Sequence, residues 1–277
     1  MSALDTLLSD HIGAWPVEHA AAAVTDGSDL LGAAGDTDRP FDLASVTKPL
    51  AALAVLIAVE EETVSLDDPA GPEGSTVAHL LAHASGLSPD SADDRLATPG
   101  AKRIYSNAGF DVLGEHVAAA ADMTFADYLH LAVIEPLGLR NTTLDGSPAK
   151  DGRASVADVA VVARELLDPT LIARETLDAA TTVAFAGLDG VVPGYGRQSP
   201  ADWGLGFELK DGKDPHWTGS ANSAATFGHF GRCGTFFWVD PEARVALVAF
   251  ADREFDRWAR EGWPALSDAV LEAVGRA

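Results

Sequence analysis

Ser45 and Lys48, three residues apart, are the side chains of this sequence whose types and spacing best suit nucleophilic chemistry. The apolar run 50–59 that follows consists of good helix formers, and Pro49 is tolerated only in the first turn of a helix, so Ser45 is expected at a helix start. Residues three apart share a helix face, which puts the lysine amine beside the serine hydroxyl. The pair therefore predicts a serine nucleophile with a lysine base.

Other interpretations of this spacing stay open. Ser45 can simply cap a core helix while Lys48 is solvated. The same spacing also recurs at Ser147 and Lys150, where the neighbours are glycine, proline and aspartate. Those neighbours favour a surface turn for the second copy.

A tyrosine and an asparagine two residues apart, Tyr105 and Asn107, form a second candidate group. In an extended segment they would face one cleft. The usual pKa of a phenol is near 10, and a neighbouring ammonium would favour the phenolate and make the tyrosine a proton shuttle. The alternative is a packed tyrosine followed by Asn107 as the cap of the next helix.

The third candidate group lies in the glycine-rich segment 228–235, at the edge of an expected sheet. Glycines in a strand let a ligand approach the backbone, and a free strand edge supplies N–H donors. The backbone N–H of Arg232 is expected to complete an oxyanion hole with that of Ser45. His229 alone is a weak signal, because the same histidine-x-glycine pattern begins at His11.

Composition excludes several classes of function. The chain has 277 residues, 47% of them hydrophobic, which is enough for one large core, and its formal charge of −23 disfavours nucleic acid and anionic membranes as partners. The single cysteine, Cys233, cannot form an internal disulfide. The amino terminus carries Asp5 and Asp10 where a signal peptide needs apolar residues, and the run 50–59 is about half of the roughly 20 residues that span a bilayer. A cytoplasmic protein without a membrane span is expected.

No metal or cofactor is expected. His79 and His83 are four apart on an expected helix, but the glutamate and third ligand of a zinc hydrolase are missing. A packing role is favoured for both histidines. The Gly-x-Ser-x-Gly pattern of α/β-hydrolases does not occur either.

The pattern of apolar residues predicts how these groups are positioned. Strands are expected near both ends of the chain, with helices between them. The expected strands are 17–25 and 30–34, which form a hairpin, then 203–209, 226–229, 235–239 and 245–251. The expected helices, besides a short amphipathic one at the start of the chain and the one after Ser45, are 76–84, 108–120, 125–133 and about 255–274. Residues 186–202 are expected to form a loop or a seam.

Taken together, the motifs resemble the serine β-lactamase and DD-peptidase superfamily, in particular its class C-like branch with D-aminopeptidases and family VIII-type esterases. Six segments along nearly the whole chain carry this resemblance. They are ASVTKPL at 44–50, HLLAHASGL at 79–87, YSN at 105–107, EPLGL at 135–139, WGLGF at 203–207, and GHFG at 228–231 with WVDP at 238–241.

The resemblance implies a fold and a set of roles. The fold is an α/β (α+β), β-lactamase/transpeptidase-like domain over residues 1–277, in which an antiparallel sheet is flanked by helices. Its sheet lobe comprises about 1–60 plus 200–277, and its inserted helical lobe about 61–199. Ser45 becomes the acylated nucleophile, and Lys48 and Tyr105 the proton-transfer pair. The implied substrate-binding residues are Asn107, His229, Gly231 and Arg232.

One departure from the family pattern bears on the substrate. Relatives that act on β-lactams or D-alanyl peptides use a threonine or serine in the middle of the strand motif to bind a carboxylate, and here that position is Phe230. Arg232 offers a replacement cation. The sequence therefore favours a small-molecule ester or small amide substrate over a β-lactam or D-alanyl peptide. The competing hypothesis is a catalytically silent module that binds a peptide or acyl ligand.

Overall fold

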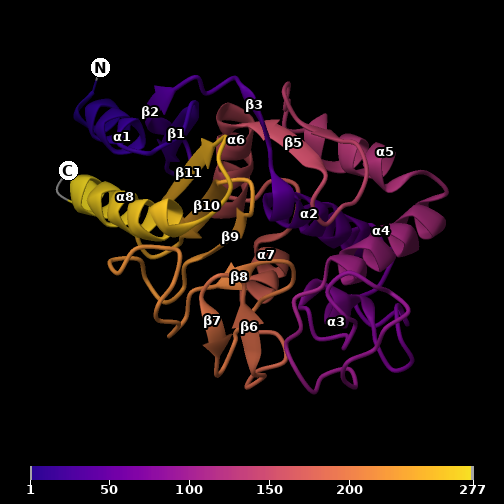
Figure 1. Ribbon diagram of the computed structural model, residues 1–277. Coiled ribbons are helices and arrows are strands. Elements are labelled where there is room, and N and C mark those ends of the chain that lie inside the picture. Colours follow the sequence, from indigo (N-terminus) through magenta and orange to yellow (C-terminus); the bar gives the residue numbers. More distant parts are fainter. Residues whose placement is uncertain (1, 276–277) are drawn as a thin grey trace.

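A six-stranded antiparallel sheet built from both ends of the chain forms the frame of the molecule (Figure 1). The computed structural model describes residues 2–275. In spatial order the strands are β2 (Leu30–Gly35), β1 (Ala20–Thr25), β11 (Val245–Ala251), β10 (Thr235–Asp240), β9 (Phe227–Gly231) and β8 (Glu208–Leu209). Because β1 pairs with β11, the amino-terminal hairpin and the carboxy-terminal strands share one sheet.

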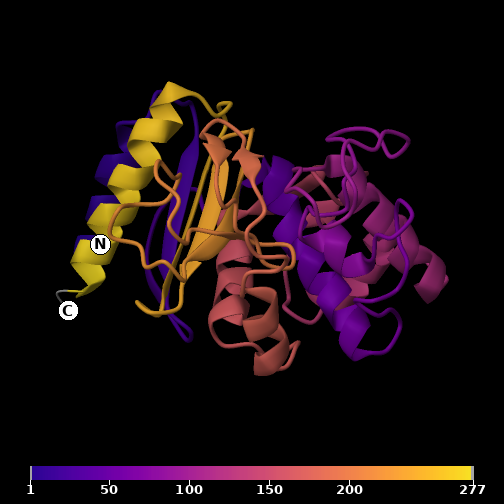
Figure 2. The same ribbon diagram turned by 90° about the horizontal axis from the view of Figure 1, so that it is seen from below.

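Helices cover both faces of this sheet, as Figure 2 shows from below. On one face α1 (Ala3–Gly13) packs against α8 (Arg257–Gly275), while α6 (Val156–Leu167) lies on the opposite face. A hydrophobic core lies on each face of the sheet. The central strand β11 is apolar throughout because its alternate side chains pack into the two cores. Leu247 and Ala249 belong to the core under α1 and α8, and Val248 and Phe250 to the core on the other side.

Helix α2 (Thr47–Glu60) is the central helix of the second core. Its residues from Thr47 to Ala58 are buried, which explains why the sequence is apolar all round the helix instead of on one stripe. A short 3₁₀ turn, η1 (Ala44–Val46), precedes it. Ser45 therefore lies in the turn just before the α-helix.

The remaining helices and small sheets surround α2. The helices are α3 (Val77–Leu81), α4 (Asn107–Ala121), α5 (Phe125–Leu129) continued by the π-helical turn η2 (His130–Ile134), and α7 (Arg174–Ala180). The small sheets comprise β3 (Pro40–Asp42), β5 (Gly152–Ser155) and β4 (Thr143–Leu144), and the hairpin β6 (Gly190–Val192) with β7 (Gly196–Gln198).

Most elements expected from the sequence are present. The expected strand at 203–209 is reduced to β8, because the chain turns at Gly206, whose φ is 91°. The loop expected over 186–202 contains the hairpin β6–β7. Helix α6 lies within the range 61–199 but packs on the sheet, so the two lobes are not divided as cleanly as the sequence suggests.

Over residues 2–275, no single helix combines the length and apolar character needed to cross a bilayer. Two consecutive helical segments, Asn107–Ala121 and Phe125–Ile134, meet these criteria of length and composition when taken together, but they are bent by 81° relative to each other.

Candidate active site

The turn that carries Ser45 is held from several sides. Ala44, the residue before it, has a φ of 46°, a conformation that costs energy for a residue with a side chain. The Thr47 hydroxyl donates a hydrogen bond to the Ala44 carbonyl at 2.7 Å, and the Thr235 hydroxyl donates one to the Leu43 carbonyl at 2.8 Å. These contacts connect the turn to its own helix and to the sheet, and they fix the direction of the Ser45 hydroxyl.

Lys48 is completely buried, and its amine reaches three oxygen atoms. Its Nζ lies 2.7 Å from the Tyr105 hydroxyl, 2.7 Å from Asn107 Oδ1 and 2.9 Å from the Ala149 carbonyl oxygen. Within residues 2–275, the amine forms no ion pair with a carboxylate. Burial without a charge partner lowers the pKa of Lys48 from 10.5 to about 7.

The amide of Asn107 has a defined orientation. Its Nδ2 donates to Asp90 Oδ1 at 2.9 Å, so its oxygen must face Lys48. Ser106, and not Asn107, caps helix α4, because the Ser106 hydroxyl accepts the Gly109 N–H at 2.9 Å. The capping role considered for Asn107 is therefore wrong.

Tyr105 joins the lysine to the serine. Its hydroxyl lies 2.6 Å from Ser45 Oγ and 2.7 Å from Lys48 Nζ, within hydrogen-bond distance of both. The ring packs against His83, Trp203 and His229, with centroids 4.6, 5.9 and 5.9 Å away. Burial raises the pKa of Tyr105, so this group is a phenol in the resting state. The expected phenolate is wrong because the lysine beside the ring is itself buried and loses its charge near neutral pH.

Strand β9 runs past the serine turn. A Cβ at Gly231 would collide with the Leu43 carbonyl oxygen, so only glycine permits this close approach. The buried His229 donates from Nδ1 to the Phe230 carbonyl at 2.7 Å, and burial lowers its pKa to about 4. Its neutral ring lies beside Tyr105, and its Nε2 has no partner among the described residues.

Arg232 follows His229 and Gly231 along the same segment, and its side chain pairs with an acid. The guanidinium is 80% exposed and pairs with Glu254 at 2.9 Å. The expected substitute cation is therefore already engaged by an acid. Phe230 packs with Phe255 and Trp263 in the core under α8.

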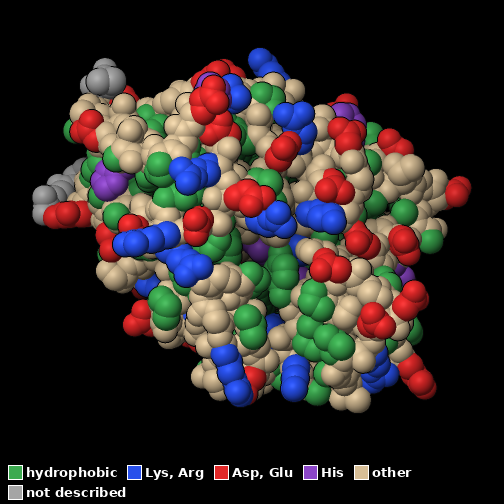
Figure 3. All heavy atoms as spheres, viewed as in Figure 1, with side chains coloured by type: hydrophobic (Ala, Val, Ile, Leu, Met, Phe, Trp, Pro, Cys, Tyr) green, Lys and Arg blue, Asp and Glu red, His purple; other side chains and the backbone are tan. Residues whose placement is uncertain are grey.

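These groups meet in one cavity of about 430 Å³. It contains Ser45, Tyr105, Asn107, His229 and Arg232, and Figure 3 shows the hollow at the centre of this face. The other lining residues are Pro193, Gly194, Trp203, Glu208, Phe230, Glu254, Phe255 and Arg260. Gly231 supports this wall through the backbone.

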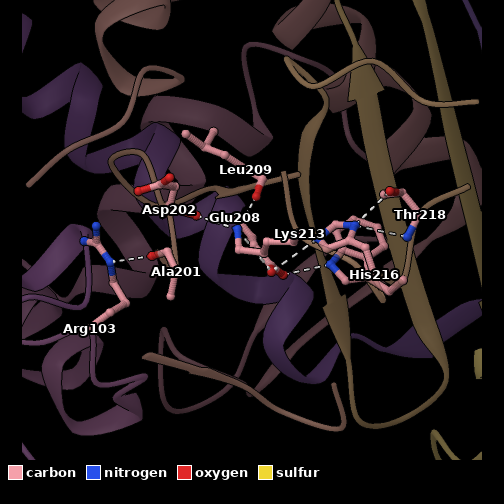
Figure 4. A network of polar contacts seen from close by, with 9 residues as sticks. Arg103, Ala201, Asp202, Glu208, Leu209, Lys213, His216 and Thr218 are labelled. Atoms are coloured by element: carbon pink, nitrogen blue, oxygen red, sulfur yellow. Dashed lines mark hydrogen bonds and ion pairs between the residues drawn. The ribbon is translucent and has the colours of Figure 1, made fainter. Parts of the chain in front are cut away.

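A buried ion network lies behind the cavity wall (Figure 4). Glu208 is 3.7 Å from the Lys213 amine and 3.4 Å from His216 Nε2, and it accepts the Trp217 indole N–H at 2.7 Å. Burial would raise the pKa of Glu208, but Lys213 and His216 outweigh burial and lower it to about 2. The carboxylate therefore stays charged and fixes the short strand β8 against its neighbours.

Sequence reasoning missed several residues of the site. The turn at Ser147–Lys150 is present as expected, yet it also supplies the Ala149 carbonyl that holds Lys48. Asp90 orients Asn107 from a loop that has no motif. The charged residues within 208–216 are the only sequence signal for the ion network. No motif or spacing in the sequence indicates Asp90.

His79 and His83 do not form a metal pair among the described residues. His79 lies 3.0 Å from the Thr76 hydroxyl and stacks on Phe185, while His83 Nδ1 accepts the Ser106 N–H at 3.2 Å. Both rings pack as expected. Within residues 2–275, the one cluster of possible metal ligands consists of Glu18, His19 and Asp252, and it includes neither of these histidines. Glu18 and Asp252 are exposed, and His19 is partly buried.

Comparison with known proteins places this site in a family. The sequence pattern described as "Beta-lactamase" matches residues 17–271. A crystal structure of a β-lactamase from Mycobacterium bovis is 54% identical and has a TM-score of 0.94, with 96% of this chain and 98% of that one covered. Simvastatin synthase from Aspergillus terreus (the LovD6 mutant) is 19% identical over 99% of this chain and 95% of that one, with a TM-score of 0.79, and shares the fold.

Curated relatives match a part of the chain. Penicillin-binding protein 4* of Bacillus subtilis is 28% identical over 139 residues, which is 38% of this chain and 31% of the relative. The D-alanyl-D-alanine-carboxypeptidase/endopeptidase AmpH of Escherichia coli is 26% identical over 44% of this chain and 41% of its own. The match thus spans well under half of each curated relative. The chain belongs to the serine hydrolases of the beta-lactamase family, in the class C-like branch related to penicillin-binding proteins.

Proposed function

We propose that the protein hydrolyses an ester or small amide through an acyl-enzyme on Ser45. The hydrogen-bond set around Lys48 carries this proposal. An uncharged amine has two N–H donors and one lone pair. Asn107 Oδ1 and the Ala149 carbonyl accept only, so they take the two N–H groups, and the lone pair is left for the Tyr105 hydroxyl.

The proton path follows from this arrangement. As Ser45 Oγ attacks the substrate carbonyl, its proton moves to the Tyr105 oxygen, and the Tyr105 proton moves to Lys48 Nζ. Reversal of both transfers delivers a proton to the leaving alcohol or amine, and the acyl group remains on Ser45. Water then hydrolyses the acyl-enzyme. Neither the phenolate nor a free ammonium is needed in the resting state.

The oxyanion is assigned to backbone donors. We infer that the N–H groups of Ser45 and Arg232 bind it, because Gly231 brings β9 against the serine turn. Donors held in this way need no reorganisation during the reaction. This role uses only the backbone of Arg232, which agrees with the engagement of its side chain by Glu254.

The wall beside the serine supports an ester or small amide substrate. In the family that the sequence resembles, a hydroxyl that binds the substrate carboxylate is typical at the position of Phe230. Phe230 has no hydroxyl and the Arg232 guanidinium is paired with Glu254, so neither side chain is free to bind a substrate carboxylate. A second candidate is β-lactam hydrolysis, favoured by the 54% identical β-lactamase. Parallel rates on a nitrophenyl ester and on nitrocefin separate the two, and faster turnover of nitrocefin would contradict the argument from Phe230.

The proposal is tested by covalent labelling. A fluorophosphonate probe is expected to add one adduct to the native protein, located on the peptide that contains Ser45 by digestion and mass spectrometry. Prior heat denaturation should abolish the adduct, since the reaction needs the folded proton path. A folded protein that stays unlabelled and turns over no ester would instead favour the silent ligand-binding module.

The pKa of Lys48 predicts the dependence of the rate on pH. Only the uncharged amine accepts the proton, so kcat/KM for a neutral ester is expected to rise about tenfold per pH unit below about 7 and to level off above it. His229, with its pKa of about 4, stays neutral over this range. Initial rates between pH 5.5 and 9, corrected for spontaneous hydrolysis, test this, and a flat profile would contradict lysine as the base.

A further inference from the structure

A second cavity, of about 610 Å³, adjoins the catalytic one. The two share Tyr105 and Pro193, so a substrate segment that leaves Ser45 past the Tyr105 ring enters the second cavity. The hairpin β6–β7 and the segment before Tyr105 form its walls. Its other lining residues are Pro89, Leu96, Lys102, Arg103, Ile104, Asp189, Gly190, Val191 and Arg197.

The body of this cavity is apolar and open to solvent. Leu96 and Val191 are each 61% exposed, and they make up two of the four large hydrophobic side chains exposed on residues 2–275. Together with Ile104 they present a surface that water solvates poorly. Exposed apolar side chains that gather in a concavity indicate a ligand site.

The charge of this cavity differs in sign from that of the whole chain. Its lining has three cations against one carboxylate, in a protein of net charge −23. Asp189 is already paired, since it accepts from Arg197 at 2.7 Å and from Ser199 at 2.5 Å. Lys102 is exposed and forms no ion pair with any described acid.

Arg103 adds a fixed positive charge behind the wall. Its buried guanidinium donates to the carbonyls of Ala82, Ala184, Phe185 and Ala201, at 2.5 to 3.1 Å. Carbonyl oxygens satisfy its donors but do not cancel its charge. Asp202 interacts electrostatically with this charge but forms no ion pair with it. The cavity therefore combines an apolar floor with a cationic end.

We propose that this cavity binds a substrate segment of apolar atoms that ends in an anion, with Lys102 as the group that recognises the anion. The inference deepens the proposed function: it names the substrate as an amphiphilic ester or amide with a negative charge remote from the scissile bond. Shorter substrates fill only the catalytic cavity, and uncharged ones of the same length lack the group that Lys102 recognises. The anionic segment belongs either to the acyl group or to the leaving group.

Two pairs of esters test the proposal and separate these sources. The acyl pair is mono-4-nitrophenyl adipate and its neutral counterpart 4-nitrophenyl hexanoate. The leaving-group pair is 3-(4-acetoxyphenyl)propanoate and its methyl ester. In at least one pair, the ratio of kcat/KM for the anionic ester to kcat/KM for the neutral ester is expected to exceed about 5. This ratio should fall about fivefold in Lys102→Ala and further in Lys102→Glu. It should also decrease in 0.5 M salt, which screens the charge of Lys102.

The ratio is the readout because a general loss of folding or chemistry cancels in it. Arg140→Ala is the matched control, since Arg140 is exposed, forms no ion pair with an acid within residues 2–275 and lies outside both cavities. It should leave the ratio unchanged. Ratios near 1 in both pairs, or ratios that do not respond to Lys102, would overturn the inference while leaving ester hydrolysis itself intact.

A binding measurement covers the case in which ester hydrolysis is not observed. Calorimetry with Ser45→Ala protein should show tighter binding of monomethyl suberate, which is anionic at one end, than of dimethyl suberate. Introducing Lys102→Ala should remove this difference. Equal affinities of the two esters would overturn the inference. If the protein bound monomethyl suberate more tightly but hydrolysed no ester, the result would count against the proposed function alone.

Discussion

Replacement of Ser45 by alanine is expected to lower kcat/KM for a nitrophenyl ester on the order of 10⁴-fold or more, because the covalent route is lost and only binding and the oxyanion donors remain. The serine is partly exposed to the cavity, and its side chain makes one hydrogen bond, with Tyr105, so the substitution should change the fold little. Steady-state rates with purified protein, together with the loss of fluorophosphonate labelling, measure this effect.

The control for Ser45→Ala is Ser9→Ala, an exposed serine on α1 outside the cavity. Its rate should equal that of the unmodified protein. If Ser45→Ala retained more than about a tenth of the activity, another group would be the nucleophile, and the proton path described for Tyr105 and Lys48 would serve no purpose.

Replacement of Lys48 by methionine is expected to lower kcat/KM roughly 10³-fold, because Tyr105 then has no acceptor for its proton. Lys48→Arg should be similarly impaired. A guanidinium stays protonated and cannot act as a base, although it keeps the positive charge. Rates of both variants at pH 8 test this prediction.

The methionine variant should lose activity without losing stability. The pKa of Lys48 is about 7 in the folded protein and 10.5 in an unfolded reference, so below pH 7 the buried amine destabilises the fold by up to roughly 4–5 kcal/mol. The lost hydrogen bonds offset part of the gain from its removal. Thermal unfolding at pH 6 should therefore show a midpoint no lower than that of the unmodified protein.

The sign of the pH effect on stability gives an independent check. Between pH 7 and 10.5 the unfolded chain binds the proton that folded Lys48 has released, so this residue's contribution to the free energy of unfolding rises with pH. Lys48→Met should lack that rise. If the methionine variant were both inactive and strongly destabilised, Lys48 would be a structural group and not the base.

Local pattern was enough to locate the main elements. The spacing of apolar residues and the turn residues predict the hairpin β1–β2, strands β9 to β11 and helices α4 and α8. Each of these elements buries one defined face or lies wholly in the core. Helices α6 and α7 and the strands β3 to β7 were missed. Helix α7 and these strands are short, and tertiary pairing decides the conformation of the strands, whereas the apolar residues of α6 recur at helical spacing and could have predicted it.

The protonation states show what local pattern leaves open. From the sequence, a lysine that acts as a base needs a lowered pKa, whereas an ammonium beside Tyr105 would favour a phenolate. In the folded protein burial dominates: the pKa of Lys48 falls to about 7 and that of Tyr105 rises. Burial is a property of the surrounding chain and not of the residues themselves.

The amino-acid sequence by itself determined the fold, and from helix periodicity and motif order it predicted a nucleophile, Ser45, with two proton-transfer partners, Lys48 and Tyr105. Only the tertiary structure decided that Ala149 and Asp90 orient the lysine and the asparagine, that Arg232 faces Glu254, and that a cationic apolar cavity continues past Tyr105. These features depend on contacts between segments far apart in the chain, and no local spacing encodes such contacts.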